Sequence, residues 1–163
     1  MHSLYIILVY LFPLAFLLHM SEELFIPGGF PKWFHLYQPQ LAQPNFKTYL
    51  KRNLIYLVSF IIVAFISADT NYFVINGPVI VCGIMGINAF GTHIIGAFKT
   101  RRYSPGMVTA IFLLIPIPLA TYILAFTLHV TGIFGIVFGL AVGLLFEVGL
   151  KNKINLNLVS NKN

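Results

Sequence analysis

Long apolar runs alternate with short polar segments along this chain. Five of the runs are almost free of charged residues and approach the roughly 20 residues that a helix needs to cross a bilayer. Helices are predicted because isolated strands would leave backbone groups unpaired in lipid. They cover residues 4–26, 53–68, 73–98, 105–130 and 132–149. The pattern therefore predicts an all-α, integral membrane helical bundle of about five transmembrane helices.

The composition agrees with this pattern. Hydrophobic residues make up 58% of the chain and charged residues only 9%, which is too little polar surface to cover a soluble globule of this size. The single cysteine, Cys82, lies inside an apolar run, so neither a disulfide framework nor a cysteine metal site is expected. The net charge of +6 comes from short clusters between apolar runs, so no nucleic acid partner is expected.

The basic residues predict the orientation. With five spans, every lysine and arginine falls on one side of the membrane, and the positive-inside rule makes that side cytoplasmic. The prediction is an N-out, C-in multi-pass protein of the inner cell membrane. The first apolar run has no basic residues before it and no small-residue cleavage site, so it is expected to stay as a helix and not to act as a signal peptide.

Residues 1–150 are predicted to form a single transmembrane domain, followed by a polar tail over residues 151–163. The segment 27–52 between the first two helices is rich in proline, glycine and aromatic residues. Such a segment is typical of a loop or short helix in the headgroup region, where aromatic side chains partition well. It is expected to cover the cytoplasmic mouth of the bundle.

Three of the four carboxylates are predicted at this cytoplasmic end. His19 precedes Glu22 by three residues and Glu23 by four, so the three side chains share one helical face. His93 lies in a stripe of small residues, which places it against protein and not lipid. Glu147 ends a second stripe of small residues, which is expected to pack closely inside the bundle or to form a homo-oligomer interface. That stripe is Gly135, Gly139 and Gly143.

Imidazoles and carboxylates in this arrangement are a plausible ligand set for a divalent ion such as Zn, Fe or Mn. The predicted metal ligands are His19, Glu22, Glu23 and His93, and Glu22 and Glu23 are also the candidates for a general base. The same residues are also compatible with interfacial ion pairs and with a histidine that only bonds a neighbouring helix. Both interpretations stay open at this point.

The segment before the fourth helix has features of an anion site. Ser104 is expected to cap the helix and Pro105 to occupy its first position, which would direct free backbone amides toward the cytoplasm. The predicted residues for a phosphate or lipid headgroup are Arg101, Arg102, Tyr103 and Ser104. An ordinary capped helix with a positively charged anchor explains the segment equally well.

The order of these motifs resembles the HXXEE domain family of small prokaryotic membrane proteins. The matching elements, over residues 11–118, are His19-Met20-Ser21-Glu22-Glu23, then Asn88 and His93, then the segment RYSPGMVT at 102–109. The family has no established activity, and its motifs have suggested a membrane-embedded, metal-dependent enzyme. By position, the resemblance implies a functional set of His19, Glu22, Glu23, His93, Tyr103, Pro105 and Gly106.

Asn88 departs from the family pattern. It precedes His93 by five residues, which rotates it by about 140° from His93 on a regular α-helix. A π-bulge near Gly91 would restore the alignment. Without such a bulge, Asn88 is expected to fall outside the site.

These residues favour a metal-dependent, hydrolase-like enzyme that acts on a lipid or lipid-linked substrate at the cytoplasmic face. A metal-free intramembrane protease of the glutamate type is an alternative, although the sequence has HxxEE in place of the EExxxR motif of that group. A small transporter, a proton relay or a lipid-binding protein without catalysis is the other alternative, because buried Glu and His residues also carry protons.

Overall fold

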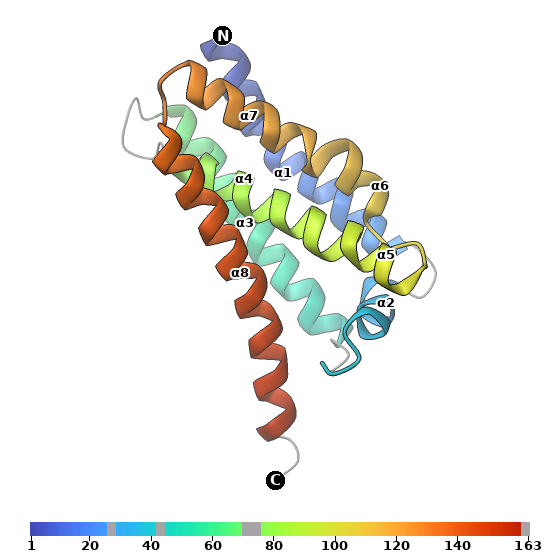
Figure 1. The fold of residues 1–163 in the computed structure, drawn as a ribbon. Helices are drawn as coiled ribbons and strands as arrows, with labels where there is room; N and C mark the ends of the chain where they lie inside the picture. Colours follow the sequence, from blue (N-terminus) through green and yellow to red (C-terminus); the bar gives the residue numbers. More distant parts are fainter. Residues whose placement is uncertain (26–28, 42–44, 70–75, 161–163) are drawn as a thin grey trace.

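The computed structural model describes residues 1–25, 29–41, 45–69 and 76–160. These ranges form an all-α bundle, and they contain no strand (Figure 1). The predicted fold class is therefore confirmed. The helices are α1 (His2–Phe25), α2 (Gly29–Tyr37), α3 (Phe46–Asp69), α4 (Asn76–Asn88), α5 (Ile95–Thr100), α6 (Met107–Thr109), α7 (Pro116–Thr127) and α8 (Ile133–Ser160), with π-helical segments at Ala89–Ile94 and Ala110–Leu114.

Among the described residues, four stretches of helix are long and apolar enough to cross a membrane, as expected of a membrane protein. They are His2–Phe25, Phe46–Ser67, Gly77–Thr100 and Met107–Thr127. The fifth predicted span corresponds to Ile133–Gly149, which is apolar but shorter. The helix that contains it, α8, continues to Ser160 and includes most of the predicted polar tail. The N-out, C-in orientation stays a prediction.

The segment predicted as an interfacial loop is largely helical. Part of it forms α2, and its end forms the first turns of α3, which begins at Phe46 and not at residue 53. The backbone N–H of Lys47 donates to Asn45 Oδ1 over 2.9 Å, so Asn45 caps α3. In α2, Phe30, Trp33 and Phe34 recur at helical spacing and are all buried. Burial of this face explains why the segment is helical.

Two predicted spans each contain a π-helical segment. The third span passes from α4 through Ala89–Ile94 into α5, and the fourth passes from α6 through Ala110–Leu114 into α7. In the fourth span, Pro116 has no N–H to donate, and the N–H of Ile115 bonds to the carbonyl of Ala110, five residues earlier. The π-helical turn therefore lies directly before the proline.

Close contact between α4 and α8 uses the predicted glycine stripe. A Cβ atom on Gly83 would lie 1.9 Å from the carbonyl oxygen of Gly139, and one on Gly143 would lie 2.4 Å from the backbone of Gly83. The two helices therefore touch backbone to backbone, as small residues allow in membrane bundles. Gly139 and Gly143 are thus used within the chain, and the homo-oligomer stays a prediction.

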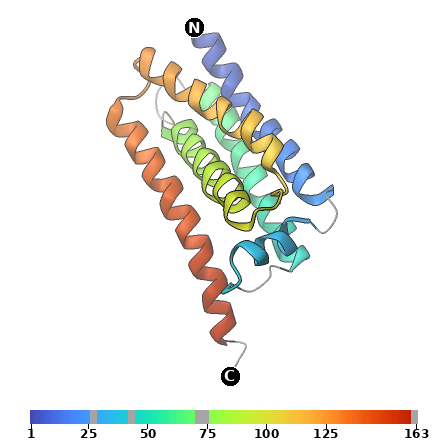
Figure 2. The same cartoon turned by 45° about the vertical axis from the view of Figure 1, so that its right-hand side comes forward.

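The two ends of the bundle differ. In both views the chain begins at one end and α8 finishes at the other (Figures 1 and 2). The end of α1, helix α2 and the α5–α6 connection lie together at the end away from the N-terminus. Residues that the sequence predicts at the cytoplasmic mouth are therefore gathered from distant parts of the chain.

Candidate metal centre

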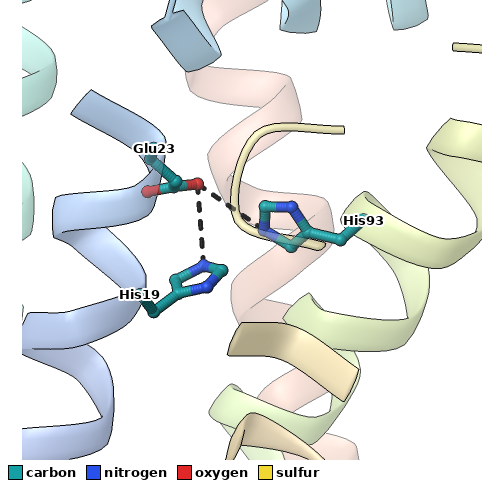
Figure 3. A group of neighbouring side chains, drawn as sticks. All are labelled: His19, Glu23 and His93. Atoms are coloured by element: carbon teal, nitrogen blue, oxygen red, sulfur yellow. Dashed lines mark ion pairs between the residues drawn. The ribbon is translucent and has the colours of Figure 1, made fainter. Parts of the chain in front are cut away.

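Helix α1 supplies two side chains of the candidate centre and the π-helical segment supplies the third. His19 and Glu23 are four residues apart on α1, so they point the same way. His93 faces them from Ala89–Ile94 (Figure 3). The exposed fractions are 1% for His19, 5% for Glu23 and 0% for His93. All three groups are thus removed from solvent.

A single carboxylate oxygen lies close to both imidazoles. Glu23 Oε1 is 3.6 Å from His19 Nε2 and 3.5 Å from His93 Nε2 (Figure 3). The three potential ligand atoms lie within 4.8 Å of one another. The other oxygen of Glu23 accepts a hydrogen bond from the buried hydroxyl of Tyr49. The carboxylate is therefore oriented with Oε1 toward the histidines.

The remaining nitrogen of each imidazole bonds to a hydroxyl group. His19 Nδ1 is 2.9 Å from Thr109 Oγ1, and His93 Nδ1 is 3.0 Å from Ser104 Oγ. The Thr109 hydroxyl also donates to Glu22 Oε2 over 2.6 Å, so it accepts the proton of His19 Nδ1–H. Such bonds fix the tautomer and leave the Nε2 lone pair available to a ligand.

These atoms fit a divalent metal ion. His93 Nε2 is buried and has no hydrogen-bond partner, and 3.5 Å is too long for an N–H···O bond. Metal–ligand bonds of about 2.1 Å in a tetrahedral site place neighbouring ligand atoms about 3.4 Å apart. The distances from Glu23 Oε1 to the two Nε2 atoms, 3.6 and 3.5 Å, are close to that value. Two histidines and one carboxylate are a common ligand set of Zn and non-haem Fe enzymes that keep a position open.

Gly106 lets the chain pass directly beside the centre. Its φ angle is +90°, and a Cβ atom there would lie 2.6 Å from His19 Cε1 and 2.9 Å from His93 Cε1. A side chain would therefore be strained and would also collide with both imidazoles. Phe30 and Trp33 of α2 also lie beside His93, with the Trp33 ring nearly parallel to the imidazole at a centroid distance of 6.3 Å. The centre is thus enclosed by a glycine and an aromatic cover.

Glu22 does not reach this centre. Its carboxylate accepts hydrogen bonds from the backbone N–H groups of Val108 and Thr109, from the Thr109 hydroxyl and from the Tyr103 hydroxyl. The amides at the start of α6 were predicted to bind an external anion, and Glu22 occupies two of them. Partial burial and the hydrogen bond to Glu22 raise the pKa of Tyr103 to about 12, so the phenol stays a donor at neutral pH.

The structure places the other residues predicted for the anion site in different surroundings. The side chain of Ser104 caps no helix, because Gly106 precedes α6 and Ser104 turns inward to His93. Pro105 lies in the connection before α6 and not at its first position. Arg101 and Arg102 are exposed in that connection, where Arg101 ends α5 with a φ of 51°. Neither arginine lines the cavity beside the centre.

A cavity of about 70 Å³ connects this centre with Glu147. His19 and Glu23 line one part of it, and Glu147 and Asn88 line another. Glu147 is 6% exposed and accepts hydrogen bonds from the Thr92 hydroxyl and, over 3.3 Å, from Asn88 Nδ2. A π-helical segment, Ala89–Ile94, does include Gly91 and His93, yet the Asn88 amide donates to Glu147, which is outside the group of His19, Glu23 and His93. Asn88 therefore belongs to the cavity wall.

Sequence reasoning missed the functional candidates Thr109, Tyr49 and Arg52. Thr109 lies within the segment compared with the family, and its hydroxyl links His19 to Glu22. Tyr49 and Arg52 are three residues apart on α3, and both line the cavity. An arginine one helical turn after a tyrosine could have indicated this pair from the sequence. The pair was missed because the sequence predicts an interfacial loop over residues 27–52.

The comparisons with known proteins identify the family of this chain. The family described as "Protein of unknown function with HXXEE motif" matches residues 10–123, a stretch that includes every residue of the candidate centre. No curated protein and no solved structure matches the chain. The match covers well over half of the 163 residues. The chain therefore belongs to the HXXEE family.

Proposed function

We propose that this protein is a membrane-embedded, metal-dependent hydrolase that acts on a lipid or lipid-linked substrate from the cytoplasmic face of the inner cell membrane. His19, Glu23 and His93 would hold the ion. The observation that carries the proposal is the pair of Nε2 atoms around one oxygen of Glu23, with His93 Nε2 buried and without a hydrogen-bond partner. A buried polar atom without a partner costs free energy unless a ligand satisfies it.

A divalent ion at this position would supply Lewis acidity and lower the pKa of bound water. The chain's own residues hold the ligands in place. Thr109 and Ser104 orient the two imidazoles, Tyr49 orients Glu23, and Glu22 in turn holds Thr109. Outer residues of this kind are needed because a metal ligand must keep one tautomer and one orientation.

Glu147 is the best candidate for a proton acceptor. Glu23 would be engaged as a ligand, and four donors hold Glu22 away from the centre. Glu147 lines the same cavity as His19 and Glu23, and Thr92 and Asn88 orient its carboxylate. Most other lining residues are apolar, so a proton transfer here would proceed with little bulk water present.

Metal content tests the proposal directly. The protein is purified in detergent without chelators, and its Zn, Fe and Mn are quantified alongside His93→Asn and His129→Asn. We expect about one ion per wild-type chain, a strongly reduced content in His93→Asn, and an unchanged content in the control. His129 is exposed and has a φ of 53°, a conformation that asparagine tolerates well. Wild-type protein that neither contains metal nor is stabilised by added metal would refute the proposal.

A proton relay is the second candidate, and one observation favours it. A hydrogen-bonded chain runs from buried His19 through Thr109 and Glu22 to the hydroxyl of Tyr103, whose side chain is partly exposed. Such chains can carry protons. In proteoliposomes, Glu22→Gln would abolish a pH-dependent flux if the protein is a relay. A hydrolase would show no flux in either form.

A further inference from the structure

An arginine lines the cavity beside the candidate metal centre. Arg52 of α3 is among the lining residues, and its Nε atom is buried without a hydrogen-bond partner. Its guanidinium carbon lies 5.9 Å from the centre of the Tyr49 ring. Because the Tyr49 hydroxyl bonds to Glu23, Arg52 is separated from the metal ligands by a single side chain.

Most of the surrounding wall is apolar. It includes Phe16, Phe60, Met85, Leu114 and Phe146. A guanidinium N–H group in such surroundings is costly unless an anion or another acceptor bonds to it. The cavity of about 70 Å³ holds a small polar group, since one water needs only about 10–15 Å³ of such space. An anionic group at Arg52 followed by an apolar chain would complement both features.

The other charged groups on the cavity are Glu23 and Glu147. With a divalent ion at Glu23, the ion and Arg52 together exceed the charge of the two carboxylates by one. The loaded cavity would therefore attract an anion. Thr92 and Asn88 already donate to Glu147, whereas Arg52 Nε has no acceptor. Arg52 is thus the group on this wall that an anionic ligand would satisfy.

We infer that this cavity binds the phosphate or carboxylate of an anionic amphiphile, with Arg52 as its counter-ion and the apolar chain along the phenylalanine-rich wall. This inference rests on the proposed function, because it assumes that the cavity is the substrate site. It moves the predicted anion contact from the exposed Arg101 and Arg102 to the partly buried Arg52, whose Nε atom is buried beside the cavity. The substrate class becomes an anionic, single- or multi-chain lipid.

Ligand binding to the intact protein tests the inference. Wild type, Arg52→Met, Arg52→Lys and Lys51→Met are placed in phosphatidylcholine nanodiscs, loaded with zinc, and titrated calorimetrically with dodecyl phosphate, dodecanoate, dodecanol and inorganic phosphate. Metal content is measured on the same samples. Lys51 is the matched control because it directly precedes Arg52 on α3, is exposed, and lines a separate outer groove.

We expect saturable binding of dodecyl phosphate and dodecanoate to wild type, and binding at least about tenfold weaker to Arg52→Met, because a charged hydrogen bond is lost. Arg52→Lys should recover part of the affinity, and Lys51→Met should match wild type. Dodecanol and inorganic phosphate should each bind at least about tenfold more weakly than dodecyl phosphate, since each lacks one half of the recognised group.

Equal affinity of Arg52→Met and wild type for dodecyl phosphate would overturn the inference, and so would dodecanol binding as tightly as dodecyl phosphate. Inorganic phosphate binding equally well would show a free-anion site and would also overturn it. Absence of zinc together with Arg52-dependent binding would reject the proposed function and retain the amphiphile site. Normal zinc content without Arg52-dependent binding would retain the proposed function and reject the amphiphile site. The Arg52→Lys variant keeps the comparison valid if Arg52→Met does not fold.

Discussion

His93 Nε2 lies 3.5 Å from Glu23 Oε1, and His93 Nε2 has no hydrogen-bond partner. This separation is too long for a hydrogen bond and is close to the spacing of two ligands on one metal ion. The two residues are 70 positions apart in the sequence. Glu23 comes from α1 and His93 from the π-helical segment of the third predicted span, so their geometry depends on how the bundle folds and not on a local motif.

Trp33 should report metal binding at this centre. It is the only tryptophan of the chain, it is 5% exposed, and its ring is nearly parallel to that of His93. We expect Co²⁺ to quench its fluorescence in wild type with saturation near one ion per chain. Removing a ligand charge in Glu23→Gln should weaken Co²⁺ binding on the order of 100-fold, since outer residues alone account for 10–100-fold.

The control for this titration is His35→Asn. His35 is an exposed histidine two residues from Trp33, and its Nδ1 bonds to the backbone carbonyl of Leu41. Quenching that is lost in His35→Asn and retained in Glu23→Gln would mean that Co²⁺ binds at the surface of α2. The buried centre would then not be the metal site.

The hydroxyl of Thr109 should control metal affinity from outside the ligand set. Thr109→Val preserves the shape of the side chain but removes the acceptor for His19 Nδ1 and the donor to Glu22. We expect metal affinity to fall about 10–100-fold while the helical content measured by circular dichroism is unchanged. Thr109→Ser should restore most of the affinity because it keeps the hydroxyl.

Thr121→Val is the matched control for this substitution. Thr121 is also a helical threonine, and it is fully buried, but its hydroxyl bonds to the carbonyl of Ile117 within its own helix. If Thr109→Val and Thr121→Val reduce metal affinity equally, the loss reflects general destabilisation. The proposed link between His19 and Glu22 would then be wrong.

Much of the centre follows from local spacing in the sequence. The i, i+4 relation places His19 and Glu23 on one helical face, and the small residues around His93 indicate that it faces protein. The structure places these three side chains in one group, and Glu22, which is also at helical spacing from His19, lies outside it. The helical bundle follows just as directly, because apolar runs of that length leave few other structures open to the backbone.

The different positions and hydrogen-bond partners of Glu22 and Glu23 could not be predicted in this way. Both carboxylates follow His19 at helical spacing, and successive residues differ by about 100° around the axis. The difference is decided by distant groups: Tyr49 bonds to Glu23, whereas Thr109 and Val108 bond to Glu22. The contact of Ser104 could not be predicted from local spacing either, because its hydroxyl forms a hydrogen bond with His93 instead of capping the helix that follows it.

A side chain at position 106 should disrupt the centre. Gly106→Ala introduces a Cβ atom 2.6 Å from His19 Cε1 at a φ of +90°. We expect a loss of about 1–3 kcal/mol in unfolding free energy from the strained backbone and a loss of metal binding from displaced imidazoles. Chemical denaturation and Co²⁺ quenching of Trp33 measure the two effects. Gly91→Ala is the control, since a Cβ atom there meets nothing within 4 Å; equal losses in both variants would contradict the role of Gly106.

Gly83 should be essential to the packing of α4 against α8. A Cβ atom on Gly83 would lie 1.9 Å from the carbonyl oxygen of Gly139, and this backbone contact cannot be relieved by rotating a side chain. We expect Gly83→Ala to lower the unfolding free energy by about 1–3 kcal/mol or more, as overpacking does, and to lower the melting temperature in detergent. Gly86→Ala, one turn further along α4 with nothing within 4 Å, should leave the melting temperature unchanged or raise it.

Gel filtration of Gly143→Ala tests the predicted oligomer. A dimer held by the stripe at 135, 139 and 143 would dissociate in this variant while each chain kept its melting temperature. A lower melting temperature without a change in elution would instead show that Gly143 serves the contact with α4 inside one chain.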